Sequence, residues 1–396
     1  MITPRPALVP ASAADVAEVL SRASRDKQTV AIHGGGTKSG WGTPGRPADI
    51  VVSTAKLNAV VAHRHGDLTA TVQAGATLAA VNKVLSEHGQ WLPLDPPWSE
   101  RATIGGIVAT NDSGPRRHRY GAPRDLIIGV DIVRADGIAA KAGGIVVKNV
   151  AGYDVARLMT GSFGSLAVIV SATFKLFPLP QTSRTVVVEL DPAASMGATR
   201  SAEFFSALLS SQLTPTAIEL QTPPPRILVR FETIEIAADQ QAAAVLKLAE
   251  AAGVGASVLL GEREQMLWQE HNGRLWHGDG AIVKVTLLPS DVAPTVGWLA
   301  DAMHGVDYGV IGRAGVGVLF VRIGGDTARQ AKIITALRER LPPGRGSAVL
   351  VRGSDHLRSL IDPWGPLGDG FELMQAIKQR FDPRGILNPG RGPGGL

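Results

Sequence analysis

Hydrophobic positions alternate between helical and extended spacing through the first ninety residues. Apolar residues recur at helical spacing between residues 16 and 23, after a capping-box pattern at Ser12 and Asp15. A second helix is predicted from Thr77, and Gly89 should end it. Short apolar or alternating runs predict strands at residues 30–32, 50–52 and 68–72. This alternation is typical of an α/β unit.

Residues 91–180 are dense in glycine. The pair Asp136-Gly137 is a hairpin signal, and Phe177-Pro178-Leu179-Pro180 interrupts the pattern. Strands are predicted at residues 127–133, 138–140, 145–147 and 166–170. We therefore expect a first domain over residues 1–180.

After residue 180, strands and longer helices alternate in a second α+β domain, residues 181–370. Its helices are predicted at 237–252 and 328–341, and its strands at 186–190, 227–231, 258–260, 282–285 and 316–323. The β-α-β spacing indicates a ferredoxin-like sheet with helices on one face, and the three prolines 223–225 a turn between two strands. In residues 371–396, Leu373, Ile377 and Phe381 line one face of a helix that ends at Asp382-Pro383.

The composition excludes several classes of chemistry. The 396 residues include 46 glycines, 26 prolines and no cysteine. Without cysteine there is no thiolate nucleophile, disulfide, cysteine zinc site or cysteine-held iron–sulfur cluster. The net charge of +5 is scattered and aromatics make up only 5%, so a nucleic-acid surface is not expected. No secretory signal or apolar run of membrane-spanning length is apparent, and we expect a cytoplasmic chain without a metal site.

Three glycine-rich segments carry the candidate chemistry. His33–Gly40 follows a strand and reads HGGGTKSG; its consecutive amides suit an anion, although a purely structural turn is the alternative. It matches neither the Walker A loop of P-loop nucleoside triphosphatases nor the dinucleotide-binding GxGxxG pattern. Residues 102–114 and 143–164 combine glycines with small hydroxyl and amide residues, which suits close backbone approach to a flat polar ligand. The basic run 116–119 is either a solvated loop or an anion site.

In their order along the chain, these segments resemble the FAD-binding PCMH-type oxidoreductases of the vanillyl-alcohol oxidase superfamily. The resemblance includes Leu94-Asp95-Pro96-Pro97 and the terminal FDP…NPGR pattern, and within the superfamily it is closest to the FAD-binding E subunits of bacterial glycolate oxidases. It implies an α+β fold: a PCMH-type FAD-binding domain of two α/β subdomains, a ferredoxin-like α+β cap, and a C-terminal helix and tail (371–396) that return to the flavin.

The resemblance also implies which residues meet FAD. The turn His33, Gly34, Gly35, Gly36, Thr37 and Lys38 would hold the pyrophosphate through its amides. Residues lining the pyrophosphate and flavin would be Thr103, Ile104, Gly105, Gly106, Thr110, Asn111, Ser113 and Gly114. Further cofactor contacts would come from Asn149, Gly152, Tyr153, the backbone of Ile169, and Asn388.

Two departures from the family pattern bear on how FAD is attached and on whether a metal is bound. Covalent members attach flavin through His or Cys; cysteine is absent, and His33 precedes the glycines instead of occupying the usual attachment position, so noncovalent FAD is expected. Metal-dependent members carry HxGDGNxH. Here His277-Gly278-Asp279-Gly280-Ala281 lacks the Asn and the second His, so no metal site is expected.

We therefore expect an FAD-binding subunit of a glycolate oxidase-like complex, which oxidises a 2-hydroxy acid such as glycolate. A chain without cysteine has no cysteine-held cluster of its own, so partner flavoprotein and iron–sulfur subunits would accept the electrons. A partner could also hold the chain at the inner membrane. A cation must fix the substrate carboxylate, and Arg116, Arg117 and Arg119 are candidates. No catalytic base is evident. The alternatives are a self-sufficient FAD dehydrogenase of another hydroxy acid or alcohol, and a non-catalytic flavoprotein scaffold.

Overall fold

The computed structural model describes residues 7–145, 152–190, 199–341 and 344–396, which divide into two compact units. The first unit comprises Met1–Ser113, Gly121–Leu179 and Pro366–Leu396. The second comprises Pro180–Gly365 and the short segment Gly114–Tyr120. The break after Leu179 lies where the sequence pattern is interrupted. No local sequence pattern indicates that Gly114–Tyr120 belongs to the second unit.

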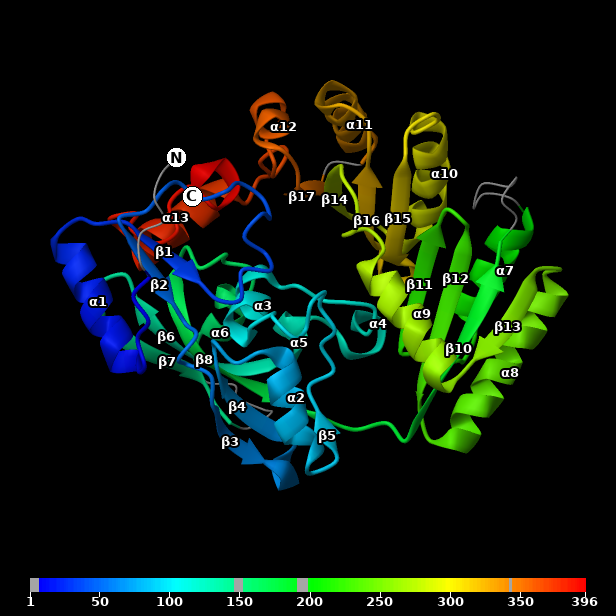
Figure 1. Ribbon diagram of the computed structural model, residues 1–396, viewed down its shortest axis with the longest axis horizontal. Helices are drawn as coiled ribbons and strands as arrows, with labels where there is room; N and C mark the ends of the chain where they lie inside the picture. The colour runs from blue at the N-terminus through cyan, green and yellow to red at the C-terminus, as the bar shows by residue number, and fades with distance from the viewer. Residues whose placement is uncertain (1–6, 146–151, 191–198, 342–343) are drawn as a thin grey trace. The chain divides into compact units, whose positions relative to one another are not determined.

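The first unit is built on a five-stranded antiparallel sheet in the order β3-β4-β8-β6-β7 (Figure 1). Two small sheets accompany it: parallel β1–β2 and antiparallel β5–β9. The strands are β1 Val30–His33, β2 Ile50–Ser53, β3 Val60–Arg64, β4 Thr69–Gln73, β5 Gln90–Trp91, β6 Ile127–Arg134, β7 Ala139–Gly143, β8 Ala167–Lys175 and β9 Phe177–Pro178. The helices are α1 Ala13–Arg25, α2 Leu78–Ser86, α3 Ile104–Thr110, α5 Pro123–Leu126, α6 Val155–Met159 and α13 Phe371–Phe381.

Local sequence signals set the ends of these elements. Ser12 and Asp15 form the predicted reciprocal capping box before α1. The Thr77 hydroxyl accepts a hydrogen bond from the Ala80 amide at the start of α2. Gly137, at φ +84°, makes the turn between β6 and β7. Helix α1 buries its apolar face, including Leu20, in a core that also contains Leu387 from the C-terminal segment.

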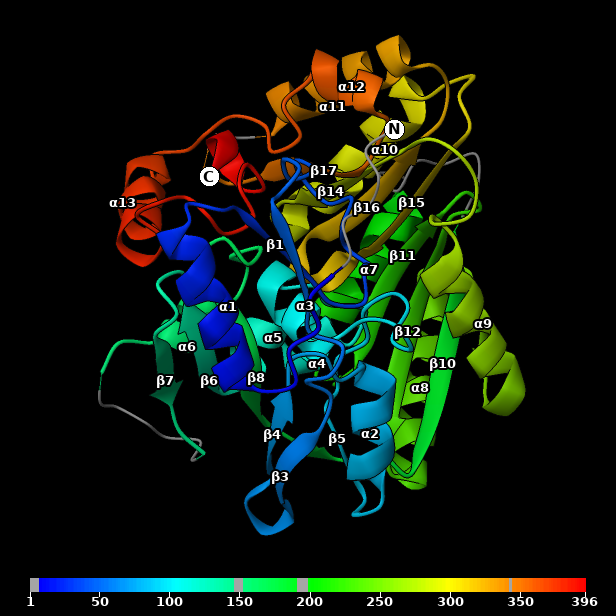
Figure 2. The ribbon, with the colours of Figure 1, turned by 60° about the vertical axis from the view of Figure 1, so that its left-hand side comes forward.

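The second unit contains one eight-stranded antiparallel sheet in the order β13-β10-β12-β11-β15-β16-β14-β17 (Figure 2). Its strands are β10 Thr182–Glu189, β11 Ala217–Thr222, β12 Arg226–Thr233, β13 Gly255–Leu259, β14 Ala281–Thr286, β15 Tyr308–Arg313, β16 Val318–Ile323 and β17 Ser347–Arg352. Its helices are α4 Arg117–Tyr120, α7 Thr199–Ser210, α8 Glu235–Ala251, α9 Gly261–Gly273, α10 Val292–Ala302, α11 Thr327–Arg340 and α12 Asp355–Leu360.

This sheet consists of two ferredoxin-like halves joined edge to edge. Strands β10–β13 with α7 and α8 form one βαββαβ unit, and β14–β17 with α10 and α11 form another. The halves meet where β11 pairs with β15. Residues of α7, α8, α10 and α11 share one core with one face of the sheet, as expected. The expectation of helices on one face alone is not met, because helix α9 packs on the opposite face, where Trp268 contacts Leu228.

The face of α13 that Leu373, Ile377 and Phe381 share is only partly covered. Ile377 and Phe381 pack against the first unit's core, whereas Leu373 is 64% exposed. The helix therefore buries the side centred on Ile377 and Phe381. Most of the strand expected at residues 145–147 lies outside the described residues.

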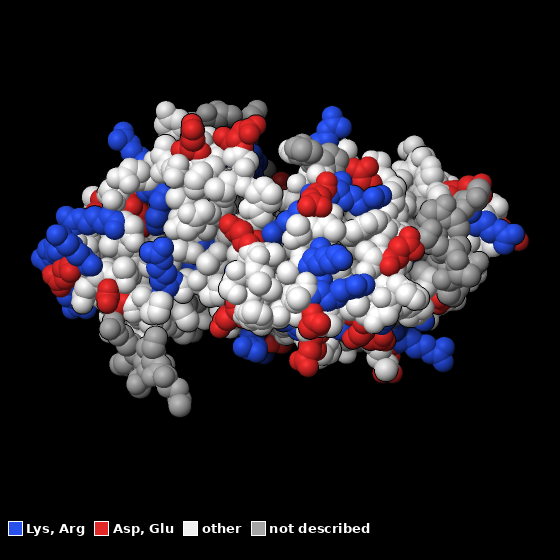
Figure 3. All heavy atoms as spheres, turned by 90° about the horizontal axis from the view of Figure 1, so that it is seen from above, with Lys and Arg blue, Asp and Glu red and all other residues white. Residues whose placement is uncertain are grey.

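The surface carries both signs of charge. Figure 3 shows Lys and Arg side chains and Asp and Glu side chains distributed over the face that it displays. Within the described ranges, no helix is long and apolar enough to cross a bilayer.

Candidate functional site

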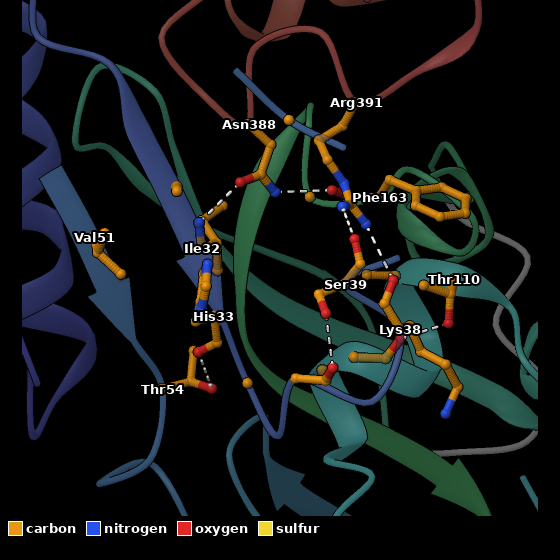
Figure 4. A pocket seen from close by; sticks show the side chains of 18 of the residues that line it. Ile32, His33, Lys38, Ser39, Val51, Thr54, Thr110, Phe163, Asn388 and Arg391 are labelled. Carbon is orange, nitrogen blue, oxygen red and sulfur yellow. Dashed lines mark hydrogen bonds between the residues drawn. The ribbon is translucent and has the colours of Figure 1, made fainter. Parts of the chain in front are cut away.

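A cavity of about 400 Å³ opens in the first unit where strand β1 ends (Figure 4). Most of its lining comes from four places: β1 with the following residues 34–39, here called the glycine loop; residues 44–48; α3 with the 163–164 turn; and the C-terminal residues 388–391. Val51, Thr54, Ala167 and Ile169 complete the lining. The volume is typical of a site for a small molecule or cofactor.

The glycine loop exposes its backbone to this cavity. A Cβ on Gly35 would lie 1.7 Å from the Arg101 carbonyl oxygen, so the loop passes too close to that carbonyl for any side chain. Gly36 has φ +71°, and a Cβ there would have no atom within 4 Å. Within the described chain, the amide N–H groups of residues 34–38 meet no hydrogen-bond acceptor. Consecutive amides of this kind form a concavity for an anion.

The start of α3 packs directly against the glycine loop: a Cβ on Gly34 would lie 2.3 Å from the Thr103 Oγ1. Thr103 precedes the helix, is 7% exposed, and its buried hydroxyl oxygen meets no partner among the described residues. Gly105 packs against Ala74, where a Cβ would come within 2.8 Å of the Ala74 Cβ. The Thr103 hydroxyl and the amides of the glycine loop therefore lie side by side without hydrogen-bond partners in the described chain. This indicates that a polar ligand supplies hydrogen bonds to both.

The cavity lining is cationic. It includes Lys38, Arg46 and Arg391, and no Asp or Glu is among the described lining residues. Lys38 is 6% exposed and pairs with the buried Asp112 at 3.0 Å between its Nζ and the Asp112 Oδ2. The lysine also lies over the ring of Trp41 at 5.9 Å. A pocket with positive side chains and free amides fits the diphosphate of a dinucleotide.

The C-terminal segment forms part of the wall, as Figure 4 shows. The Asn388 Oδ1 accepts from the Ile32 amide at 2.8 Å, and its Nδ2 donates to the Phe163 carbonyl at 2.8 Å. Arg391 donates to the carbonyls of Lys38 and Ser39. Side chains that lie more than 350 positions from β1 and the glycine loop thus complete the pocket.

The structure brings together most of the residues predicted to meet a cofactor. The cavity is lined by His33, Gly34, Gly35, Gly36, Thr37, Lys38, Thr103, Gly105, Gly106, Thr110, Ile169 and Asn388. Other predicted residues do not line it. Ile104 is fully buried in α3, the Asn111 side chain accepts from the Arg124 amide, and Tyr153 is 95% exposed. Ser113, Gly114 and Gly152 are also absent from this lining, and Asn149 lies outside the described residues.

The predicted substrate arginines belong to the second unit. The Nε and Nη2 atoms of Arg116 donate to the two carboxylate oxygens of Glu232 at 3.0 and 2.8 Å. Burial raises the pKa of Glu232, but the guanidiniums of Arg116 and Arg230 outweigh it and hold that pKa below its ordinary value of 4.5. Arg116 is thus engaged in a bidentate ion pair, while Arg117 and Arg119 lie on the short helix α4.

The most buried histidine of the described chain does not form an open catalytic dyad. The Nε2 of His271 on α9 lies 2.9 Å from the Oε2 of Glu219 on β11, but the two residues are only 1% and 0% exposed. His63 and His65 lie beside His88, and the rings of His65 and His88 stack at 4.6 Å. The described residues contain no group of three or more His, Cys, Asp or Glu that could hold a metal ion.

Sequence reasoning missed Arg46, Arg391 and Asp112. Arg46 lies outside every glycine-rich motif. Asp112 lies within one, but no local pattern pairs it with Lys38. Arg391 is the last residue of the NPGR pattern, whose first residue, Asn388, was singled out. That pattern was the one signal that could have identified Arg391.

Comparison with known proteins identifies the family. The FAD binding domain matches residues 4–143, and the C-terminal domain of FAD linked oxidases matches residues 365–391. The chain is 31% identical over 379 residues to the glycolate oxidase subunit GlcE of Escherichia coli, an alignment that covers 94% of this chain and 95% of that protein. The chain belongs to the FAD-linked oxidases.

This FAD-linked oxidase has further relatives along its full length. It is 25% identical to the glycolate oxidase subunit GlcD of Bacillus subtilis, covering 98% of this chain and 88% of the other. It is 28% identical to a D-2-hydroxyglutarate dehydrogenase of Xanthomonas citri, covering 98% and 89%. The family places the chain among FAD-dependent oxidoreductases.

Solved structures agree on the fold of this FAD-linked oxidase. An alkyldihydroxyacetonephosphate synthase superposes with a TM-score of 0.73 at 16% identity, over 96% of this chain and 75% of the other. The VAO-type flavoprotein MtVAO615 of Myceliophthora thermophila superposes with a TM-score of 0.66 at 16% identity, over 96% and 78%. These similarities establish the PCMH-type α+β fold. The free amides, the cationic lining and the unpartnered Thr103 hydroxyl fit FAD in the cavity.

Proposed function

We propose that this chain is the FAD-binding subunit of a glycolate oxidase-like complex, which oxidises a 2-hydroxy acid such as glycolate to the 2-oxo acid. The observation that carries the proposal is the similarity to GlcE over nearly the full length of both chains. The cationic cavity of the first unit supports it, because that cavity supplies what an FAD diphosphate requires.

The chain's own residues have a binding and orienting task in this reaction. The glycine loop and Thr103 would hold the diphosphate, and Asn388 would fix β1 and the 163–164 turn, which both line the cavity. FAD, when bound, supplies the redox chemistry by accepting two electrons from the α-carbon of the hydroxy acid. The hydroxyl proton must pass to a base, and the substrate carboxylate must meet a cation.

We propose that the electrons leave through a partner iron–sulfur subunit. The chain has no cysteine, so it holds no cysteine-ligated cluster of its own. A complex with flavoprotein and iron–sulfur subunits would provide the path, and such a partner could hold the chain at the inner membrane.

We propose noncovalent FAD. Cysteine is absent, which removes one of the two common attachment chemistries. His33 lines the cavity at the end of β1, so it is the residue to test for the other. Acid precipitation of the loaded protein checks this: flavin should stay in the supernatant, and a flavin-bearing His33 peptide in mass spectra would contradict it.

The decisive experiment loads the purified chain with FAD and records its visible spectrum anaerobically with glycolate, D-lactate or D-2-hydroxyglutarate. Bleaching by glycolate, with turnover that depends on the co-purified partner subunits, supports the proposal. Turnover of glycolate at the full rate by the lone chain with an artificial acceptor would rule out the subunit role. Gly35→Ala is the control without a cofactor, because its Cβ would lie 1.7 Å from the Arg101 carbonyl oxygen.

A second candidate is a self-sufficient FAD dehydrogenase of another hydroxy acid. The similarity to D-2-hydroxyglutarate dehydrogenase over 98% of this chain supports it. Under this alternative the lone chain bleaches and turns over with D-2-hydroxyglutarate but not with glycolate. A flavoprotein that bleaches with no hydroxy acid would instead be a scaffold subunit.

A further inference from the structure

The C-terminal residues Asn388, Pro389 and Arg391, here called the C-terminal clasp, bind each of the other walls of the cavity. Asn388 joins the Ile32 amide of β1 to the Phe163 carbonyl. The Pro389 carbonyl accepts from the Arg46 amide at 3.0 Å. Figure 4 shows Asn388 above Ile32 and Arg391 above Ser39.

Arg391 makes the contacts to the glycine loop. Its Nη1 donates to the Ser39 carbonyl and its Nη2 to the Lys38 carbonyl, at 2.5 and 3.2 Å. Its guanidinium lies 5.8 Å from the centre of the Phe163 ring. The side chain lines the cavity, so its charge lies beside the loop and the space that the loop encloses.

The contacts of Arg391 add to the few hydrogen bonds that the loop makes by itself. The Gly36 carbonyl accepts from the Ser39 amide at 3.4 Å and from the Ser39 hydroxyl at 3.0 Å, which closes the turn, but the amides of residues 34–38 meet no described acceptor. Gly36 adopts its left-handed backbone without steric cost but leaves the chain free to move, so contacts from outside the turn are needed to fix the direction of these amides. Two carbonyls at the loop's C-terminal end are fixed by one planar guanidinium, which holds them in a defined geometry.

We propose that Arg391 is a positioning residue for the FAD diphosphate: by gripping the Lys38 and Ser39 carbonyls it keeps the amides of the glycine loop facing the cavity. The inference rests on FAD as the cofactor in the proposed function. It extends that function by assigning diphosphate affinity to a residue outside the glycine-rich motifs. In this proposal the two N–H groups of the Arg391 guanidinium that bond the Ser39 and Lys38 carbonyls fix the loop, and the positive charge of Arg391 alone is insufficient.

Two variants separate these contributions. Arg391→Met keeps an apolar stem against Phe163 and removes both donors. Arg391→Lys keeps the charge but presents a point-like ammonium instead of a planar fork. Arg384→Ala is the matched control, because Arg384 belongs to the same segment and donates to the carbonyl of Ser24, away from the cavity.

The test measures dissociation constants of the full chain for FAD, by quenching of flavin fluorescence, and for ADP, which carries a diphosphate without flavin, by competition. Arg391→Met should weaken both ligands by the same factor, roughly tenfold or more, and Arg391→Lys should recover only a minor part. Arg384→Ala should leave both constants unchanged. Circular dichroism and the melting temperature check that each variant is folded.

Unchanged FAD affinity in a folded Arg391→Met chain would overturn the inference, and so would equal losses in Arg384→Ala. Full recovery by Arg391→Lys would overturn the positioning role, since charge alone would then suffice. Weakened FAD with unchanged ADP would also overturn it, because the defect would lie at the flavin. Failure of the unmodified chain to bind FAD would instead remove the proposed function, so the two failures are distinguishable.

Discussion

Gly36 and Gly89 offer a matched pair for testing what the glycine loop does. Both have a left-handed backbone, with φ of +71° and +65°, and a Cβ at either position would have no atom within 4 Å. Gly89 ends the turn that follows α2 and lies outside the cavity, whereas Gly36 lines it. Substitution by alanine therefore imposes the same backbone strain at two places, of which only one concerns the cofactor.

The strain is expected to be similar in both variants. A left-handed residue with a side chain costs about 1–2 kcal/mol. For a domain of this size, a loss of 1 kcal/mol lowers the melting temperature by roughly 2–4 °C, so Gly36→Ala and Gly89→Ala should each melt about 2–8 °C below the unmodified protein without FAD.

Only Gly36→Ala should weaken FAD binding. Its methyl group occupies space beside the free amides, and loss of one hydrogen bond to a charged group costs about 1.5–3 kcal/mol. The dissociation constant for FAD should then rise roughly 10- to 150-fold. Fluorescence titration of both variants measures this. An equal loss of FAD in Gly89→Ala, or wild-type affinity in Gly36→Ala, would refute the assignment of the loop to the diphosphate.

Three further substitutions test the ion pairs and the helix face. Asp112→Ala should lower the free energy of unfolding by about 3–5 kcal/mol in urea, because Lys38 stays buried without its counter-charge; a loss below about 1 kcal/mol would argue against a structural pair. The lowered pKa of Glu232 means that its stabilisation is complete above pH 4.5 and is lost as the pH falls through its folded-state pKa. Unfolding measured at pH 7 and pH 3 should therefore depend less on pH in Glu232→Gln than in the unmodified chain, and an equal dependence would contradict this. Leu373→Ser should change stability by less than about 0.5 kcal/mol, since the side chain is exposed, and a larger loss would indicate a hidden contact.

The sequence predicted the elements whose signals are local. The capping box at Ser12, the Thr77 cap and the turn at Gly137 each depend on residues within a few positions of one another. The glycine-rich segments could be assigned to a cofactor because close backbone approach leaves few residue types possible. The cavity accordingly gathers most of the residues that these segments supplied.

Pairings between distant parts of the chain left no such signal. Arg116 lies 116 positions from Glu232, and neither residue has a neighbour that indicates the other. The basic run around Arg116 therefore left a solvated loop and an anion site equally open, and the structure shows it in an ion pair within the second unit. Helical spacing likewise placed Leu373 on one face with Ile377 and Phe381, but it shows which residues share a face and not how much of that face a neighbour covers.

The division of the chain affects when the cavity can form during synthesis. The strands and helices of the second unit's sheet occupy one continuous stretch, so each ferredoxin-like half can fold from residues close together in the chain as it emerges. The cavity requires Asn388 to reach Ile32, a partner made 356 residues earlier. A nascent chain shorter than 388 residues thus lacks part of the wall, so the complete FAD cavity forms only after the sheet of the second unit has been synthesised. The delay between these two events is a property of the chain's order, and it sets the moment at which the protein becomes a flavoprotein.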